Sequence, residues 1–250
     1  MKLKLSLAFI ALYLLSLVIT APASLIMGFI PENLGIKIGS VSGTVWKGKL
    51  SQVEYQQQPK LQTLSWKFNW LALLKLNLKI DIKFDNGRRV LNGVGSVNYG
   101  FSGLRLTGVN IDMQATELIP YLNLPIAVTP SGKLTLTIEN GAQGKPYCEA
   151  LDGYLVWHDA QVETPMASID LASPSVDLSC LDGELVASLT QDSEQLATHV
   201  NIVLSEGGMY QLKGDIIGTD KLDPTILQAL SWIGPKKESG ETILNFSGRL

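Results

Sequence analysis

The chain has 250 residues, of which 46% are hydrophobic and 17% charged, and its formal net charge is −3. This composition permits one or two folded domains together with a membrane segment, and it excludes a disordered chain. Nucleic-acid binding requires a concentrated basic surface, whereas the sequence has no run of four or more basic residues. We therefore expect no nucleic-acid partner.

An uncharged and mostly apolar segment of 27 residues runs from Leu5 to Pro31. As a helix that rises about 1.5 Å per residue it would be about 40 Å long, enough to cross a hydrocarbon layer of about 30 Å even with a kink at Pro22. Lys2 and Lys4 precede the segment and Glu32 follows it, which predicts a cytoplasmic N-terminus and export of the rest.

A cleaved signal peptide is the alternative, because Ala21-Pro22-Ala23 has the small-x-small form of a processing site. The apolar sequence continues to Ile30, where a mature protein usually turns polar, so we favour an uncleaved anchor. Residues 1–31 are then expected to form the cytoplasmic N-terminus and transmembrane anchor. Residues 32–250 are expected to form an exported β-rich domain.

Two cysteines, Cys148 and Cys180, lie 32 positions apart in the exported part. In an oxidising compartment they are candidates for a disulfide, which would stabilise the fold by about 3–4 kcal/mol in the chain-entropy model. The alternative is two independent buried thiols. A zinc site is not expected, because the pair has neither a C-x-x-C spacing nor accompanying histidines.

Period-two alternation dominates the sequence after the anchor, as expected of strands that bury one face. In Leu76–Phe84 apolar side chains alternate with Asn, Lys, Asp and Lys. Similar runs occupy Gln62–Phe68, Gly95–Phe101, Val109–Met113, Lys133–Ile138, Gly153–Trp157, Glu184–Leu189, Thr198–Leu204, Met209–Ile216 and Thr242–Leu250. Turn signals separate several runs: Asp85-Asn86-Gly87, Asn140-Gly141, Ser205–Gly208 and Ser239-Gly240. The pattern predicts a mainly β fold with a long, mostly antiparallel sheet.

Only three short segments resemble helices: Asn69–Leu74, Ala115–Leu122 and Asp223–Ile233. The last begins well, with Asp223 at the N-cap and Pro224 at the first helical position. We expect all three to cover a sheet. Short segments with a central glycine recur along the chain, beginning at residues 41, 91, 130, 151, 181, 212 and 246. Glycine in a strand permits a bulge or a sharp twist, so we expect the sheet to curl.

The sequence offers little for catalysis. Its two histidines, His158 and His199, stand in separate strand-like segments, and no nucleophile elbow, zinc-protease motif, P-loop or dinucleotide fingerprint occurs. Carboxylate pairs such as Asp170 with Asp177, or Asp192 with Glu194, lie in polar positions typical of solvated charges. We expect no enzyme, no catalytic or metal-binding residue and no cofactor.

The segment "VSGTVWKGKL", Val41–Leu50, alternates until Lys47-Gly48-Lys49 and leaves Trp46 on the side expected to face water. We expect the first exported strand to cover Val41–Val45 and the chain to bend at Gly48. Trp46 is expected to pack beside the short helix Asn69–Leu74; the alternative is a place in the aromatic belt of the membrane interface.

The chain resembles the type II secretion system protein N family. The resemblance covers essentially the whole chain, and its most specific elements are Gly43-Thr44-Val45-Trp46-Lys47-Gly48 and the strand Leu64-x-Trp66-x-Phe68 leading into Leu71–Leu74. The glycine-centred segments are also similar to those of AsmA-like envelope proteins. The resemblance implies a single-pass inner-membrane protein with a periplasmic domain, other secretion-system components as partners, and neither catalytic residues nor a cofactor.

Strands with one wholly apolar face need something to cover that face. Our first hypothesis is a non-enzymatic secretion component that works through periplasmic protein contacts, with strand edges open to a partner strand. The second is an AsmA-like protein whose apolar trough binds phospholipid. The third is an unrecognised envelope enzyme. A trough left open by the fold would favour lipid, and a core closed by the Asp223–Ile233 helix or a second sheet would oppose it.

Overall fold

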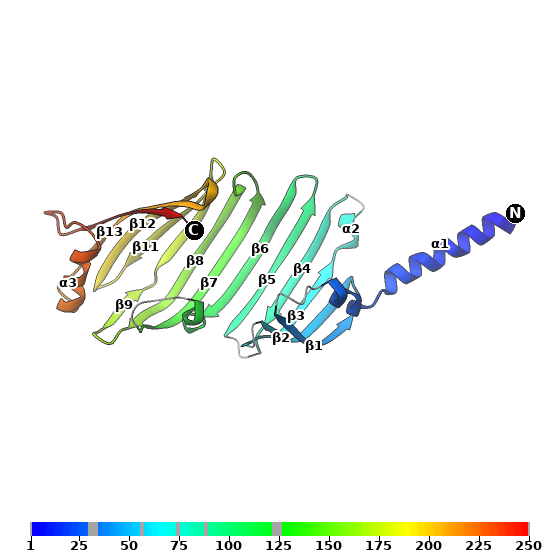
Figure 1. The fold of residues 1–250 in the computed structure, drawn as a ribbon, viewed down its shortest axis with the longest axis horizontal. Coiled ribbons are helices and arrows are strands. Elements are labelled where there is room, and N and C mark those ends of the chain that lie inside the picture. Colours follow the sequence, from blue (N-terminus) through cyan, green and yellow to red (C-terminus); the bar gives the residue numbers. More distant parts are fainter. Residues whose placement is uncertain are drawn as a thin grey trace. The chain divides into compact units, whose positions relative to one another are not determined.

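The structure, a computed structural model, describes residues 2–29, 35–55, 58–73, 76–87, 90–121 and 127–249. The chain divides into two compact units, unit 1 at Met1–Val97 and unit 2 at Asn98–Leu250. Each unit is described by itself below, and Figure 1 names the helices and strands.

Helix α1 covers Lys2–Thr20, and a 3-10 helix, η1, follows at Ala23–Phe29. The single helix expected across Leu5–Pro31 is therefore wrong beyond Thr20. Pro22 explains the break, because proline disfavours helical geometry in the residue before it and has no N–H to continue the helix. Within the described part of the chain, no helix has both the length and the hydropathy of a membrane-crossing segment.

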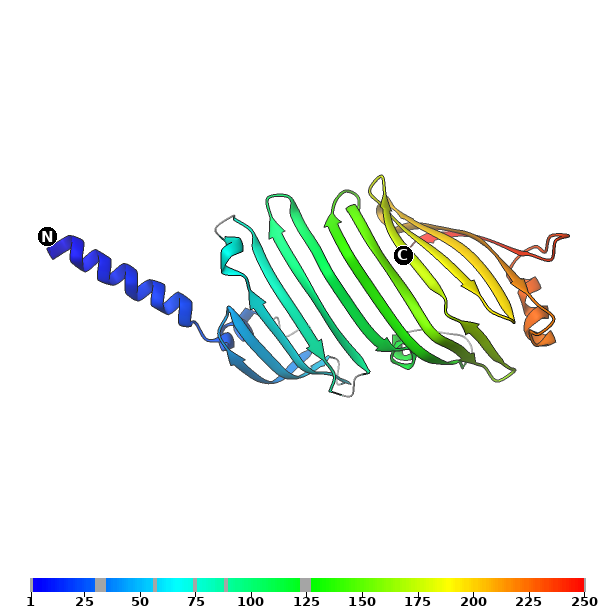
Figure 2. The same ribbon diagram turned by 180° about the vertical axis from the view of Figure 1, so that it is seen from behind.

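Unit 1 consists of α1, η1, a short helix α2 at Trp70–Leu73, and antiparallel strands in sequence order (Figures 1 and 2). The strands are β1 (Ile36–Gly43), β2 (Lys47–Tyr55), β3 (Gln58–Phe68), β4 (Leu78–Asp85) and β5, whose bounds are Leu91–Gly100. Leu50, Leu64 and Phe84 pair across β2, β3 and β4 and share one face. The expected alternation is confirmed there, although β4 starts two residues late because Leu76 has a left-handed φ of 56°.

Unit 2 is mainly β, with antiparallel pairing throughout. Its strands are β6 (Gly103–Gln114), β7 (Thr129–Gln143), β8 (Cys148–Glu163), β9 (Ser168–Ala172), β10 (Ser175–Leu181), β11 (Glu184–Asp192), β12 (Leu196–Ser205), β13 (Met209–Gly218) and β14 (Thr242–Arg249). Each lies beside its sequence neighbour except that β9 pairs only with β8, while β10 pairs with β8 and β11. The mainly β, antiparallel fold class is thus confirmed.

Three short helices accompany these strands: η3 (Ala115–Tyr121), η4 (Glu206–Gly208) and α3 (Pro224–Ile233). As predicted, α3 starts at a capped N-terminus, where Asp223 Oδ1 accepts a hydrogen bond of 2.8 Å from Thr225 N–H. The expected helix at residues 115–122 is 3-10 rather than α, and its last residue lies outside the described range.

One face of the unit 2 sheet is apolar from β6 to β14. Directly paired residues form what we call the apolar row: Ile111, Leu136, Leu155, Val176, Leu189, Val200, Gly214 and Leu244. Only Val200 and Leu244, at 8% and 7% exposure, are buried. The neighbouring row on the other face is mainly polar: Asp112, Thr135, Val156, Ser175, Thr190, His199, Asp215 and Ile243.

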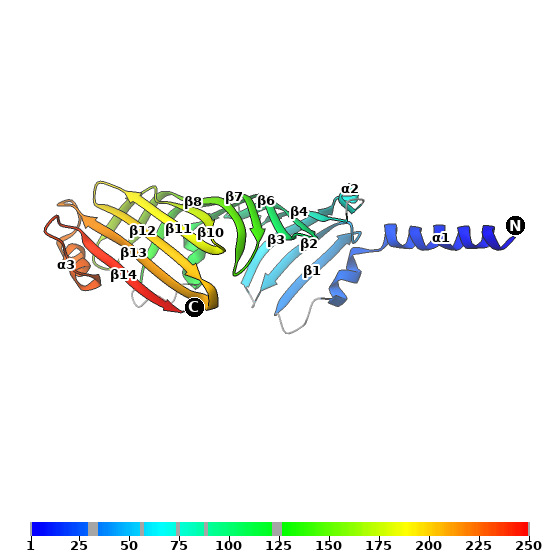
Figure 3. The same ribbon diagram turned by 90° about the horizontal axis from the view of Figure 1, so that it is seen from above.

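The buried end of the apolar row lies near α3. Leu222 and Leu230 are 3% and 8% exposed, and both side chains pack over Gly218 at the end of β13. At the other end of unit 2, η3 contacts β6 and β7. Within unit 2, β13 and β14 curl out of the plane of β7 and β8 (Figure 3). All described strands of this unit belong to one sheet, so its apolar face has no second sheet over it.

Candidate functional site

The segment singled out in the sequence forms the tight turn between β1 and β2. Thr44 N–H donates to Lys47 O at 2.9 Å, and Lys47 N–H donates to Thr44 Oγ1 at 3.2 Å. Gly43, with φ of 90°, pairs with Gly48 at the base of the turn. The expected bend at Gly48 is wrong, because Gly48 already lies inside β2 and the turn residues are Thr44, Val45 and Trp46.

This turn holds the end of α1. The Trp46 indole N–H donates to Val18 O at 2.7 Å, and Val45 N–H donates to Ala21 O at 2.9 Å. The last four carbonyls of a helix have no partner within the helix, so Val18 O gains from the indole a hydrogen bond that α1 cannot supply. Pro22 also forms an isolated bridge with Thr44. The turn therefore joins the helix directly to the sheet.

Aromatic rings surround Trp46 where it contacts the end of α1. The Trp46 ring lies 4.4 Å from the ring of Trp70 in α2 and 5.7 Å, edge-on, from that of Phe68 in β3. The Trp66 indole N–H donates to Val45 O at 2.8 Å, and its ring covers the α-carbon of Gly48. We call Trp46, Trp66, Phe68 and Trp70 the tryptophan joint. Packing of Trp46 against the short helix is as expected, and the joint offers no nucleophile, acid or base.

The predicted disulfide joins Cys148 at the start of β8 to Cys180 near the end of β10, with the sulfur atoms 2.07 Å apart. Strands β8 and β10 are already direct neighbours, paired from Asp152 with Ser179 to Val156 with Ser175. The bond therefore fastens two strands whose connecting segment also contains β9.

The other titratable residues considered in the sequence do not form a catalytic group. His158 is exposed, and His199 Nδ1 lies 3.5 Å from Asp215 Oδ2 on the polar face. Glu194 pairs with Lys221 at 2.7 Å in an exposed loop. Over the described residues, no three or more His, Cys, Asp or Glu side chains gather closely enough to hold a metal ion.

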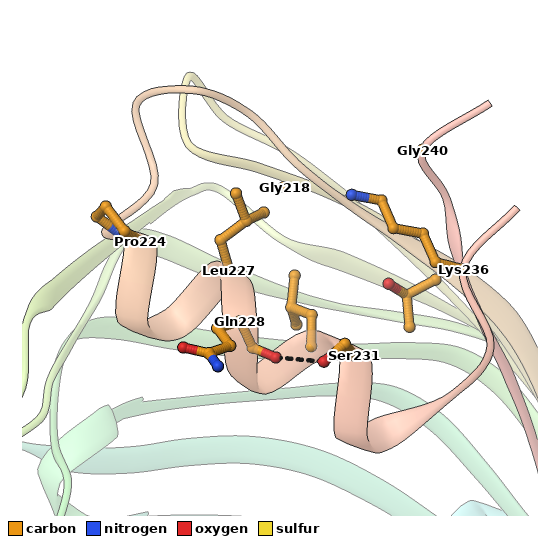
Figure 4. Close-up of a pocket in the computed structure, with 9 residues that line it drawn as sticks. Gly218, Pro224, Leu227, Gln228, Ser231, Lys236 and Gly240 are labelled. Carbon is orange, nitrogen blue, oxygen red and sulfur yellow. Dashed lines mark hydrogen bonds between the residues drawn. The ribbon is translucent and has the colours of Figure 1, made fainter. Parts of the chain in front are cut away.

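A cavity of about 320 Å³ lies between α3 and the ends of β13 and β14 (Figure 4). Pro224, Leu227 and Leu230 supply its apolar wall, and Gln228, Ser231, Lys236 and Thr242 its polar groups. The Ser231 hydroxyl donates to Gln228 O at 2.6 Å, and the Lys236 side chain reaches over the cavity from the opposite segment. No carboxylate lines the cavity, so Lys236 has no acid or base partner within it.

Comparison with known proteins covers nearly the whole chain. The family model "Type II secretion system (T2SS), protein N" matches residues 34–245. This chain belongs to that family. The type II secretion system protein N of Aeromonas hydrophila is 31% identical over 247 residues, which cover 97% of this chain and 96% of the relative. That of Vibrio cholerae serotype O1 is 27% identical over 245 residues, covering 98% and 97%. No solved structure matches the chain.

Membership in the protein N family confirms the resemblance carried by the tryptophan joint and its turn. The matched range contains Gly43, Trp46, Gly48 and Trp66 as well as both cysteines. The family description names a component of a secretion system rather than a class of enzyme.

Proposed function

We propose that this protein N is a non-enzymatic inner-membrane component of the type II secretion system, and that it aids export of folded proteins from the periplasm across the outer membrane through periplasmic protein contacts. The observation that carries the proposal is the family match over residues 34–245. The family description names a secretion-system component, which favours a binding role over catalysis.

The side chains of α1 support a membrane anchor at the N-terminus. Phe9 is 70% exposed, Leu12 69% and Leu15 60%, and a helix of 19 residues is about 28 Å long. Large exposed apolar surfaces of this kind are stable in lipid rather than in water. With Lys2 and Lys4 on the cytoplasmic side, the sheet would lie in the periplasm.

The outer edge of β14 supports a protein contact. β14 pairs with β13 from Thr242 to Arg249. The start of its outer edge is occupied, because Ile243 N–H donates to Pro235 O at 3.0 Å and Lys236 bridges Thr242, but no described strand pairs with the edge beyond Ile243. It contains neither Pro nor Lys, the residues that usually protect an edge strand, and Phe246 beside the edge is 43% exposed. A partner strand can add its backbone hydrogen bonds to such an edge.

Deletion of the gene in its native host tests the role in export. We expect type II substrates to accumulate in the periplasm, and plasmid-borne wild-type protein to restore secretion. Because the joint holds the proposed anchor to the sheet, Trp46→Ala should restore less secretion at equal protein level than Trp157→Ala in β8. Unchanged secretion after deletion would contradict the proposal.

Phospholipid binding along the apolar face of unit 2 is the second candidate. The observation in its favour is the apolar row, in which Ile111, Leu136, Leu155, Val176 and Leu189 remain partly exposed. Mass spectrometry of lipid carried by the purified protein tests it. Leu155→Asp should remove such lipid, whereas Thr135→Asp, on the polar face, should leave it in place; equal lipid in both variants would exclude this role.

A further inference from the structure

Charge is divided sharply between the two units. Unit 1 contains 12 Lys and Arg against 4 Asp and Glu, a formal net charge of +8, whereas unit 2 contains 8 against 19, a net charge of −11. The total of −3 conceals this division. A strong charge asymmetry between two parts of a chain points to an oppositely charged partner for each part.

Lysines of unit 1 gather on one face of β2, β3 and β4. Lys47 pairs directly with Lys67, and Lys49 pairs with Ser65, which pairs with Lys83. Directly paired residues have Cβ atoms about 5 Å apart, and next-but-one residues on a strand lie about 7 Å apart. Lys47, Lys49, Lys67 and Lys83, which we call the lysine face, therefore form one compact patch.

Two carboxylates share this face with the four lysines and offset only part of their charge. Asp81 lies directly opposite Lys67 and also accepts a hydrogen bond of 2.5 Å from Ser96 Oγ, and Asp85 is the other carboxylate on this side of β4. In the described residues, all five ion pairs of the protein lie in unit 2. Like charges placed directly opposite each other on a sheet are destabilising, so Lys47 and Lys67 would gain from an anion.

The lysine face begins where α1 ends. Lys47 directly follows Trp46, whose indole binds Val18 O in the last turn of α1. Trp70, whose ring contacts that of Trp46, is 46% exposed. Aromatic rings of this type collect at the membrane interface, and basic side chains nearby reach phosphate groups. If α1 is in a bilayer, lipid headgroups are thus the nearest anions.

We propose that the lysine face binds anionic phospholipid headgroups of the membrane that holds α1. This inference rests on the proposed membrane anchor, because α1 brings the face to the bilayer. Each lysine near an anionic surface strengthens binding by about fivefold at ordinary salt. The patch would thus hold unit 1 against the membrane in addition to α1.

Amine acetylation of the full chain on vesicles, read by mass spectrometry, tests this inference. One vesicle is phosphatidylcholine and the other contains about one third phosphatidylglycerol. We expect the lysine face to be acetylated roughly fivefold more slowly on the anionic vesicle, with the difference lost in about 1 M NaCl. Lys145 and Lys213 of unit 2 should react equally on both.

A triple variant, Lys49→Gln with Lys67→Gln and Lys83→Gln, should remove the lipid dependence of Lys47 acetylation. A control with the same change of charge, Lys145→Gln with Lys213→Gln and Lys236→Gln, should retain it. Equal acetylation of the wild-type lysine face on both vesicles would overturn the inference. So would protection of the lysine face by an added acidic protein when neither vesicle protects it. If the chain binds only anionic vesicles, and the triple variant binds neither, the lysine face binds anionic lipid by itself and only the proposed anchor by α1 fails.

Discussion

At the scale of single residues, one indole N–H links α1 to the sheet. Replacing Trp46 with Phe keeps a ring beside Trp70 but leaves Val18 O without its 2.7 Å donor. We expect a loss of about 1 kcal/mol in the free energy of unfolding of this contact. Hydrogen exchange at Val45 N–H, which is bonded to Ala21 O, should accelerate correspondingly.

Trp70→Phe is the matched control for this substitution, because the Trp70 ring contacts the ring of Trp46 but does not supply the hydrogen bond to Val18 O. Its Val45 exchange rate should stay close to that of the wild type. Equal acceleration in both variants would show that ring packing, and not the hydrogen bond, secures α1.

Glycine is required at position 48 because the Trp66 ring lies close to the backbone there, and not because of the backbone angles of Gly48. A Cβ at this position would overlap the ring of Trp66. Since the Trp66 N–H is also fixed on Val45 O, the ring cannot move without losing that bond. Gly48→Ala should therefore lower the free energy of unfolding by about 1–3 kcal/mol. Gly28→Ala, where nothing lies near the added carbon, should change it little in the same urea titration.

Asp112 should make stability depend on pH. Burial raises the pKa of its carboxyl, but hydrogen bonds from Lys133 at 3.0 Å and Thr135 at 2.8 Å outweigh burial, so the pKa lies below its ordinary value. A carboxyl with a lowered pKa in the folded state stabilises the protein above its ordinary pKa, and this contribution fades as the pH falls toward the lowered value.

Asp112→Asn should accordingly cost about 0.5–1 kcal/mol at pH 7, a small value because Lys133 is half exposed. The difference from wild type, measured by urea unfolding over a series of pH values, should shrink below about pH 4. A difference that stays constant down to pH 2 would exclude the ion pair as its cause.

At the scale of elements, the disulfide is the strongest single constraint. Replacing both Cys148 and Cys180 with Ser should lower the free energy of unfolding by about 3–4 kcal/mol, because the unfolded chain loses a closed loop spanning 32 positions. Reductant should lower the stability of the wild type toward that of the variant. If reductant destabilised the variant equally, the bond would not be responsible.

The strands could be predicted because alternation is local. The run at Thr198–Leu204 became β12 and that at Met209–Ile216 became β13, each extended by a few residues. The short strands β9 and β10 were missed, since "SIDLA" and "SVDLSCL" are bounded by Ser and Pro and resemble loop sequence. Asn140-Gly141 was wrong as a turn, because the residues lie within β7 next to a bulge after Ile138.

Helix ends, like strands, could be predicted only where the signal is local in the sequence. Asp223 and Pro224 specify the start of α3 by local hydrogen bonding and a fixed φ, so the sequence was sufficient. The end of α1 depends partly on Val18 and Trp46, which are 28 positions apart. The sequence predicts a kink at Pro22, but it could not predict that the Trp46 indole binds the last turn of α1.

At the scale of the whole molecule, the sequence could predict an apolar face but not what lies over it. Whether a sheet is covered depends on which strands become neighbours, and that follows from the register of pairs far apart in the chain. The tryptophan joint was visible as a motif, yet its contact with α1 was not. The lysine face was hidden because Lys47, Lys67 and Lys83 meet only through pairing.

In-cell photocrosslinking from unit 2 tests most directly whether this protein N works through contacts with other secretion components. A photoreactive residue replaces Asn245, which is exposed on the edge strand β14. Asp177, exposed on β10 between two paired strands, is the matched control. We expect a protein adduct containing a secretion-system component from position 245 and none from position 177. Adducts with phospholipid alone at position 245 would contradict this expectation.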